Sequence, residues 1–349
     1  MKIVFRVDAS LQAGHGHVMR CLTLAAGLRE QGAECTFICR AHTGHLAELI
    51  GHRGFRVHLL PLPKSTSLDT ATYADWIGDS WQNDAAQTVS LLENQVIDWL
   101  VVDHYGLDAR WDSALAKHAE RILVIDDLAN RPHACQLLLH QTFGRTPADY
   151  RGLVKEDCHL LCGSEFALLH RDFKALRASS LVRRQANPFE NLLIFMGGSD
   201  PDNFSLQILQ QLETIPRFHS DKILLILGGG SVWKDTIEDY LDNSALNVEL
   251  RCNVDNMAQL ISEADCAIGA SGGSTWERAC LGLPMIQLRI APNQTTIARQ
   301  LNDNGSIVGI DTPEQLADAL DNASKARRKL SLLSASLTDG AGADRVIDA

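Results

Sequence analysis

After a short, mostly apolar run at residues 3–7, the chain reads Asp8-Ala9-Ser10-Leu11-Gln12-Ala13-Gly14-His15-Gly16-His17-Val18-Met19-Arg20 and continues with helical periodicity. This order predicts a strand, a glycine loop and a helix. Gly14 and Gly16 let the backbone turn tightly and come close to a bound group, and the first helical amides point into the same space. We therefore expect the loop to hold an anionic or hydroxyl-rich ligand.

His17 lies near the predicted start of that helix. The positive end of the helix dipole disfavours an imidazolium there and helps to keep the ring neutral. A neutral imidazole accepts protons, so His17 is a candidate general base. The alternative is an ordinary turn in which His17 is a polar capping residue, because glycine patterns are weak signals without their context. This stretch alone leaves both interpretations open.

The composition limits the class of protein. The chain has 349 residues, of which 45% are hydrophobic, which is enough for a large core and more than one typical domain contains. The 32 basic and 43 acidic residues give a net charge of −11, and no basic cluster lies beside aromatic residues, which argues against a nucleic-acid surface. Nine cysteines without a C-x-x-C pair indicate buried thiols in a reducing cytoplasm. The chain shows neither a signal-peptide pattern nor an apolar run near the roughly 18 residues of a membrane span, so we expect a soluble, cytoplasmic protein.

Apolar runs alternate with segments of helical period in both halves, which is typical of parallel α/β units. Helices are expected at about 17–31 and 72–94 and from Thr312 onward. The expected strands are 2–8, 34–39, 55–60, 98–103, 121–126, 137–139, 159–161, 192–196, 223–227, 248–250, 266–268, 285–288 and 307–310. The fold class is therefore α/β, with two open parallel-sheet, Rossmann-like domains.

Domain boundaries follow from where this pattern stops. Residues 171–190 contain five basic residues, lose the apolar periodicity and are expected to form a linker. An N-terminal domain at 1–170 would then carry the glycine-histidine loop, and a second domain would span 191–335. The tail at 336–349, rich in Gly, Ala and Asp, is expected to fray.

Three junctions in the second half carry more than turn chemistry, and ligands of open α/β sheets gather at such strand ends. Residues 196–201 contain glycines, a hydroxyl and a carboxylate. Residues 268–278 contain a run of small residues at a helix start, where backbone amides can hold a diphosphate. Residues 289–294 contain two side-chain amides. Each has an alternative as an ordinary turn or a helix cap. Residues 103–105, after a first-half strand, can likewise be a surface turn.

Several motifs are absent. The chain has neither the G-x-x-x-x-G-K-[ST] phosphate loop nor a G-x-G-x-x-G after the first strand, which argues against ordinary ATPases and Rossmann dehydrogenases. No His, Cys and carboxylate set has convincing metal-ligand spacing, and His15 with His17 is too little for zinc. We expect no metal and no other cofactor.

Taken together, the motifs resemble a known family. They are Arg6 to Ser10, Gly14 to Cys21, Val102 to Tyr105, Asp126 to Ala129, Gly163 to Leu169, Gly197 to Asp200, Thr275 to Pro284 and Ala291 to Gln294. The pattern covers nearly the whole chain and resembles the GT-B glycosyltransferase architecture, two such domains facing a cleft. Within it, the chain is similar to the UDP-2,4-diacetamido-2,4,6-trideoxy-β-L-altropyranose hydrolases of pseudaminic acid biosynthesis. One departure is His15, where a small polar residue is more usual.

The resemblance implies hydrolysis of that UDP-sugar to UDP and the free sugar, with inversion at the anomeric carbon. His17 would be the base that activates water, and Asp8, Tyr105 and Asn293 would orient the water or the sugar. The implied substrate-binding residues are Gly14, Gly16, Arg20, Gly198, Ser199, Asp200, Val254, Asn256, Ser271, Gly272, Gly273, Ser274, Thr275, Glu277 and Gln294.

Within that set, the diphosphate would lie at residues 271–275, ribose at Glu277 and uracil near 253–256. The expected partner is this small molecule alone, bound by a monomer without nucleic acid or membrane. Three alternatives are a GT-B glycosyltransferase with a lipid or sugar acceptor, a nucleotide-sugar 2-epimerase and a non-catalytic nucleotide-sugar binder.

Overall fold

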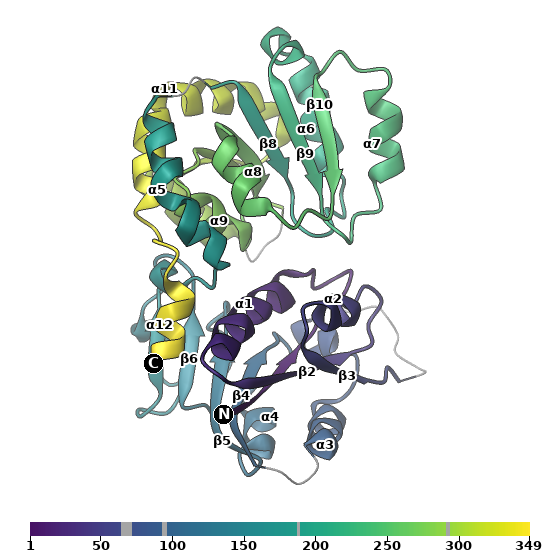
Figure 1. The fold of residues 1–349 in the computed structure, drawn as a ribbon, viewed down its shortest axis with the longest axis vertical. Coiled ribbons are helices and arrows are strands. Elements are labelled where there is room, and N and C mark those ends of the chain that lie inside the picture. The colour runs from purple at the N-terminus through teal and green to yellow at the C-terminus, as the bar shows by residue number, and fades with distance from the viewer. Residues whose placement is uncertain (64–71, 93–95, 187–188, 291–293) are drawn as a thin grey trace. The chain divides into compact units, whose positions relative to one another are not determined.

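The computed structural model describes residues 1–63, 72–92, 96–186, 189–290 and 294–349. The chain forms two compact units, Met1–Leu168 with Ala343–Ala349 and Leu169–Gly342. Each unit contains one open sheet whose strands are all parallel, and helices connect most of the successive strands (Figure 1). The predicted fold class is confirmed.

The N-terminal sheet has the order β3-β2-β1-β4-β5-β6-β7. Its strands are β1 (Lys2–Val7), β2 (Glu34–Arg40), β3 (Arg56–Leu60), β4 (Ile97–Asp103), β5 (Ala119–Ile125), β6 (Leu137–His140) and β7 (His159–Cys162). Its helices are α1 (Gly16–Glu30), α2 (Ala47–His52), α3 (Trp81–Leu91) and α4 (Ala109–Leu115), with short 3-10 turns η1 (Tyr73–Ile77), η2 (Pro147–Tyr150) and η3 (Ser164–Phe166). The strand order reverses between β1 and β4, and this point is where open α/β sheets bind ligands.

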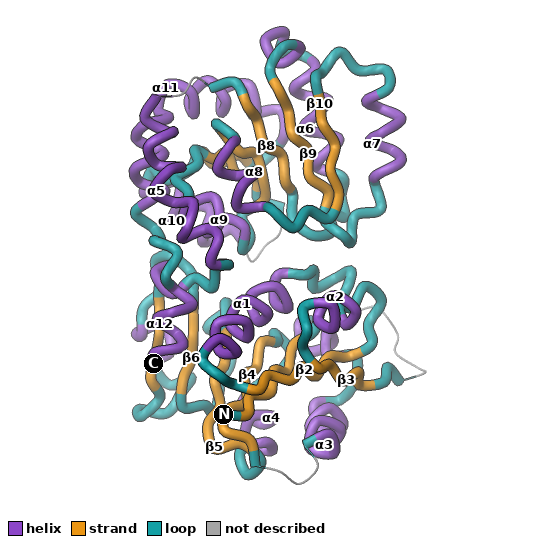
Figure 2. The backbone as a smooth tube through the Cα atoms, in the orientation of Figure 1, coloured by secondary structure: helices purple, strands orange, loops and turns teal. Residues whose placement is uncertain are grey.

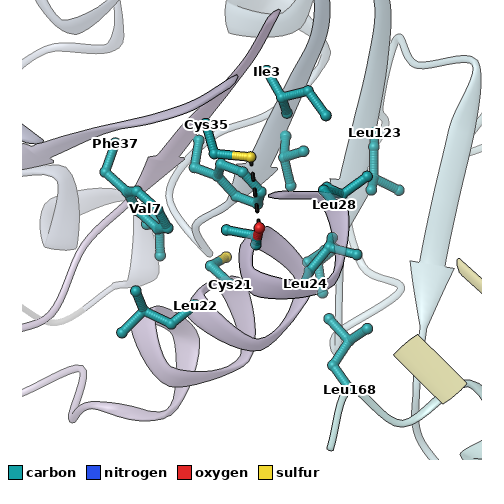
Figure 3. Close-up of a cluster of buried hydrophobic side chains, with 14 of the residues drawn as sticks. Ile3, Val7, Cys21, Leu22, Leu24, Leu28, Cys35, Phe37, Leu123 and Leu168 are labelled. Carbon is teal, nitrogen blue, oxygen red and sulfur yellow. Dashed lines mark hydrogen bonds between the residues drawn. The ribbon is translucent and has the colours of Figure 1, made fainter. Parts of the chain in front are cut away.

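Two apolar layers sandwich this sheet. On one face, α1 packs its buried leucines over the stacked rings of Phe5 and Phe37, whose centroids lie 4.8 Å apart. Figure 3 shows this cluster, in which the Cys35 thiol donates to the carbonyl of Ala25 in α1. On the other face, α3 and α4 bury a second cluster around Trp111. Burial on both faces explains why the strands read as continuous apolar runs.

The C-terminal sheet has the order β10-β9-β8-β11-β12-β13. Its strands are β8 (Asn191–Phe195), β9 (Lys222–Leu227), β10 (Val248–Cys252), β11 (Cys266–Ala270), β12 (Met285–Leu288) and β13 (Val308–Ile310). Its helices are α5 (Arg171–Ala186), α6 (Phe204–Glu213), α7 (Lys234–Leu241), α8 (Met257–Glu263), α9 (Ser274–Cys280), α10 (Thr295–Asn304) and α11 (Leu316–Ala335), with 3-10 turns η4 (Pro216–His219) and η6 (Pro313–Gln315). Figure 2 marks these strands and helices along the backbone. Here the order reverses between β8 and β11.

The expected linker is instead largely a helix of the C-terminal unit. Helix α5 occupies residues 171–186 and packs on α8 and α9. Its basic residues hold the carbonyl ends of neighbouring helices, since Arg177 donates to the carbonyls of Cys280 and Ala335. The sequence was misleading because arginines that bond to buried carbonyls look like solvent-exposed charges in a pattern of apolar residues.

The structure corrects three further expectations. The tail does not fray, because α12 (Gly342–Asp348) buries Val346 in the core of the N-terminal unit. The helical segment expected at 72–94 is split into η1 and α3 by Gly78, which has a φ of 70°. The expectation of buried thiols fails at Cys252, which is exposed.

A buried ion cluster ties α3 to the first two strands. The Asp84 carboxylate accepts from Arg6 at 2.6 and 3.1 Å, from Arg40 at 2.7 Å and from the Trp111 indole at 2.9 Å. All four side chains are fully buried. Because buried charges are costly without a partner, this cluster fixes the position of α3 strongly.

We therefore predict that Asp84→Asn lowers the free energy of unfolding of the N-terminal unit by about 3 kcal/mol or more, because two buried guanidinium groups lose a counter-charge. Chemical denaturation would measure this change. The control is Asp157→Asn at an exposed carboxylate, which should change stability by less than about 0.5 kcal/mol. Equal stability of the two variants would contradict the assigned role of the cluster.

Candidate active site

The glycine-histidine loop lies at the strand-order reversal of the N-terminal sheet, between β1 and α1. Gly14 has a φ of 73°, and its N–H donates to the Ser10 carbonyl at 2.9 Å, which closes a tight turn. Gly16 begins α1 and has a negative φ, so the turn itself depends on Gly14. This turn brings His17 and Arg20, on the first turns of α1, to the end of β4.

Asp103, the last residue of β4, joins the two side chains. Its carboxylate accepts two bonds from the Arg20 guanidinium, at 2.6 and 2.7 Å. Nδ1 of His17 lies 3.3 Å from Oδ1 of the same carboxylate. A carboxylate at this nitrogen favours a proton on Nδ1, which leaves Nε2 free to accept another. His17 therefore has the arrangement of a general base oriented by a carboxylate.

The protonation of His17 is set by competing effects. Burial lowers its pKa below the usual range, the charge of Asp103 acts to raise it, and the charge of Arg20 lowers it. The His17 side chain is 12% exposed, so it is accessible despite its surroundings. A neutral ring at pH 7 is what proton abstraction requires.

Asp127 and Tyr105 complete the group around Arg20. Arg20 donates to both oxygens of Asp127, at 2.8 and 3.0 Å, and the Tyr105 hydroxyl donates to Asp127 at 2.9 Å. Burial would raise the pKa of Asp127, but the Arg20 charge brings it down to about 2. Burial and the charge of Asp127 raise the pKa of Tyr105 well above its usual range, so its hydroxyl stays protonated. The Tyr105 ring meets His17 edge-on, with centroids 4.5 Å apart.

Asp8 has a structural environment. It is 2% exposed, and its carboxylate accepts from the Arg6 side chain and from the Arg40 backbone N–H, each at 2.6 Å. Nε2 of His104 lies 3.3 Å from the other oxygen. Because Nδ1 of His104 accepts from the Gly106 N–H, the proton of this ring lies on Nε2 and points at Asp8. Both carboxylate oxygens of Asp8 thus face protein partners, and these contacts give no support to its expected role in orienting water.

An aromatic wall beside Tyr105 was not expected. Tyr73 and Trp76, both on η1, lie with ring centroids 5.2 and 5.8 Å from that of Tyr105. Gly106 allows this approach, because a Cβ there would come within 2.7 Å of the Tyr73 carbonyl oxygen. No local sequence signal marks these two residues, whereas Asp103 and Asp127 could have been found from their places at strand ends.

In the C-terminal unit, glycine loops follow β8, β9 and β11, and the loops after β8 and β9 are in contact. A Cβ on Gly228 would come within 2.5 Å of the Gly198 backbone, and the Gly230 N–H donates to the Gly198 carbonyl at 2.9 Å. Gly197, like Gly272 and Gly273, has open space where a Cβ would be. The backbone of these loops is therefore accessible to a ligand at the strand-order reversal.

The expected residues at and after the β11 loop have distinct environments. Ser271 and Thr275 are buried, and Thr275 accepts a hydrogen bond from Gln287 at 2.9 Å. Ser274 begins α9, and Glu277 on its first turn is half-buried. Burial raises the pKa of Glu277 to about 7. This carboxylate therefore titrates near neutrality.

The remaining expected residues differ in their hydrogen-bond partners and in their exposure to solvent. Asp200 is buried, and its carboxylate accepts from the amides of Phe204 and Ser205 at the start of α6. Gln294 accepts from the Ile290 N–H at 3.1 Å. Ser199 and Val254 are half-buried, and Asn256 is exposed at the start of α8. Asn293 lies outside the described residues.

Over the described ranges, no group of three or more His, Cys, Asp or Glu side chains is placed to hold a metal ion. None of the helices in the described part of the chain combines the length and apolar character that crossing a membrane requires.

Comparison with solved structures identifies the architecture as GT-B. The crystal structure of Acinetobacter baumannii MurG matches 99% of this chain and 98% of its own, with a TM-score of 0.65 and 14% identity. A Staphylococcus aureus MnaA structure with UDP covers 99% of this chain and 94% of the MnaA chain, with a TM-score of 0.65 and 12% identity. At such identities the likeness shows the fold alone. No known protein-family profile matches the chain.

Among curated proteins, the chain is similar to the UDP-2,4-diacetamido-2,4,6-trideoxy-β-L-altropyranose hydrolase of Campylobacter jejuni. The two are 26% identical over 309 residues, which cover 87% of this chain and 97% of the relative. The Bacillus subtilis spore coat polysaccharide biosynthesis protein SpsG is 24% identical over 168 residues, or 48% of each chain. The resemblance seen in the motifs is thus confirmed over most of the chain.

We predict that Asp103→Asn moves the pKa of His17 further down, because the carboxylate charge that opposes burial is lost while the charge of Arg20 remains. Titration of the imidazole ring protons by NMR would measure it. His15 is the internal control, since burial alone lowers its pKa. An unchanged or higher pKa of His17 in the variant would contradict the contact.

Proposed function

We propose that the protein hydrolyses UDP-2,4-diacetamido-2,4,6-trideoxy-β-L-altropyranose to UDP and the free sugar, a step of pseudaminic acid biosynthesis. The observation that carries this proposal is His17 beside Asp103, an accessible imidazole held next to a carboxylate at a ligand-binding sheet edge. The similarity to the Campylobacter jejuni hydrolase over 87% of the chain supports the choice of substrate.

In the reaction, Nε2 of His17 takes a proton from water as the water oxygen attacks the anomeric carbon. A bond forms between that oxygen and the anomeric carbon, and the bond from the carbon to the diphosphate oxygen breaks. UDP leaves with the electron pair, and attack opposite UDP inverts the configuration. Asp103 stabilises the imidazolium that forms, and Arg20 fixes the carboxylate.

The other residues of the N-terminal group orient the sugar. Tyr105 remains a hydroxyl, held by Asp127 and in contact with the His17 ring. Tyr73 and Trp76 extend the same surface with aromatic faces, which suit the apolar side of a deoxysugar and its acetamido methyl groups.

We assign Asn293, in the second half of the chain, a sugar-orienting role from the family resemblance.

The C-terminal unit would bind UDP at the carboxyl ends of β8 and β11. The diphosphate would lie at residues 271–275, where the backbone of Gly272 and Gly273 is open, and preorganised amides would stabilise the leaving-group charge. Glu277 would accept hydrogen bonds from the ribose hydroxyls, and residues 253–256 would lie at the uracil.

The activity test follows UDP release from this UDP-sugar without any acceptor. We expect rapid release by the wild type, slow release from UDP-N-acetylglucosamine, and a loss of kcat of about 100- to 10,000-fold in His17→Asn, because the base is removed. His15→Asn is the matched control and should retain most activity. Release that depends on an added lipid or sugar acceptor would instead identify a glycosyltransferase, and UDP binding without turnover would identify a binder.

We further predict that uridine binds more weakly as the pH falls from 8 to 6. The carboxylate of Glu277, with a pKa raised by burial to about 7, is the acceptor for ribose and is lost on protonation below that pH. Uridine is the probe because it has no phosphate that titrates in this range. Calorimetry should show the pH dependence in the wild type and its loss in Glu277→Gln. A pH-independent wild type would contradict the assignment of Glu277 to ribose.

A further inference from the structure

Arg278, on α9, is a buried cation with unused hydrogen-bond donors. Its side chain is 2% exposed. Nη2 donates to the Ala270 carbonyl at 2.8 Å, but Nε and Nη1 have no hydrogen-bond partner among the described residues. Buried polar groups are almost always paired, and an unpaired guanidinium is especially unfavourable. These free donors therefore call for an explanation.

A second buried arginine of the same unit shows the contrast. Arg184, on α5, is 7% exposed and also has no carboxylate among its hydrogen-bond partners in the described residues. All three of its nitrogens nevertheless donate, to the carbonyls of Leu281, Ala264 and Ile261 among others. The unit thus contains one buried arginine whose donors are satisfied by backbone oxygens and one whose donors are not.

The free donors of Arg278 lie at the strand-order reversal of the sheet. Gly269 on β11 pairs in register with Phe195 on β8. A Cβ on Gly269 would lie 1.9 Å from Nη1 of Arg278 and 2.5 Å from the Phe195 carbonyl oxygen, so the guanidinium packs against Gly269 in the space that a side chain there would fill. The buried Ser271 hydroxyl, next to Ala270, also has no partner among the described residues. Two unsatisfied polar groups thus adjoin the accessible glycine loops.

The charge of Arg278 is not neutralised nearby. No ion pair to it is formed by the described residues, and the acidic group that acts on it is the adjacent Glu277. Burial lowers the pKa of Arg278 to about 10, so it remains a cation at neutral pH. Glu277, with a pKa of about 7, is only partly ionised there. The site therefore has a positive charge that a bound anion can balance.

We infer that Arg278 is the buried counter-charge for the diphosphate of the bound nucleotide. This inference rests on the proposed function, in which UDP occupies the carboxyl ends of β8 and β11. Arg278 would turn its unpaired N–H groups to the anion and would balance the charge that grows on UDP as it leaves. Its contribution should depend on the phosphates of the ligand and should be small for the nucleoside.

Calorimetric binding of uridine, UMP and UDP tests this role. We compare the wild type with Arg278→Met, with Arg278→Gln, which keeps a neutral donor for Ala270, and with the matched control Arg184→Met. We expect both Arg278 variants to weaken UDP binding by about 10- to 100-fold and uridine binding by less than about threefold. Arg184→Met should lower the thermal stability and leave the ratio of the UDP and uridine affinities unchanged.

Thermal unfolding without ligand separates a binding role from a structural one. Replacing an unpaired buried cation by an apolar side chain should not lower the melting temperature. Equal loss of UDP and uridine affinity, unchanged UDP affinity, or failure of both Arg278 variants to fold would overturn the inference. A wild type that binds uridine but gains nothing from the phosphates would overturn it as well. Absence of both UDP and uridine binding in the wild type would overturn the proposed function and this role together.

Discussion

The bidentate contact between Arg20 and Asp103 is the interaction on which the N-terminal site depends. It joins the first turns of α1 to the end of β4, 83 positions away in the sequence, at distances of 2.6 and 2.7 Å. The same carboxylate faces Nδ1 of His17. The contact between Arg20 and Asp103 therefore also determines how His17, the candidate base, is oriented. Asp127 then fixes the far side of the guanidinium and, through it, the Tyr105 hydroxyl.

The two units share one topological feature, a reversal of strand order, but place different side chains at it. In each, the strand order reverses beside the first strand and leaves an edge where loops from adjacent strands meet. The N-terminal edge holds paired carboxylates and guanidinium groups around an imidazole that burial keeps neutral. The C-terminal edge holds open glycine backbone and the unbalanced charge of Arg278. Proton abstraction suits the first edge and anion binding suits the second.

The sequence predicted the fold well, because each of the thirteen strands in the described part of the chain overlaps an expected strand, and the central strands are the apolar runs that burial on both faces of a parallel sheet requires. It also placed His17, Arg20 and Tyr105 in one site. It could not pair His17 with Asp103, since this contact depends on the order of strands in the sheet. The expectation of a linker at α5 was wrong, because the arginines of this helix bind buried carbonyls. Asp8 and Asp200 were expected at the ligand, but contacts within the protein occupy both carboxylates.

The central claim is that water activated by His17 attacks the anomeric carbon. The most direct test is a single turnover of the UDP-sugar in water labelled with heavy oxygen, followed by mass spectrometry of both products and early NMR spectra of the sugar. We expect label on the anomeric oxygen of the sugar, unlabelled UDP, and the α anomer formed first from the β-linked substrate. Label in UDP would show attack at phosphorus, and a first-formed β anomer would show retention; either result would contradict the account.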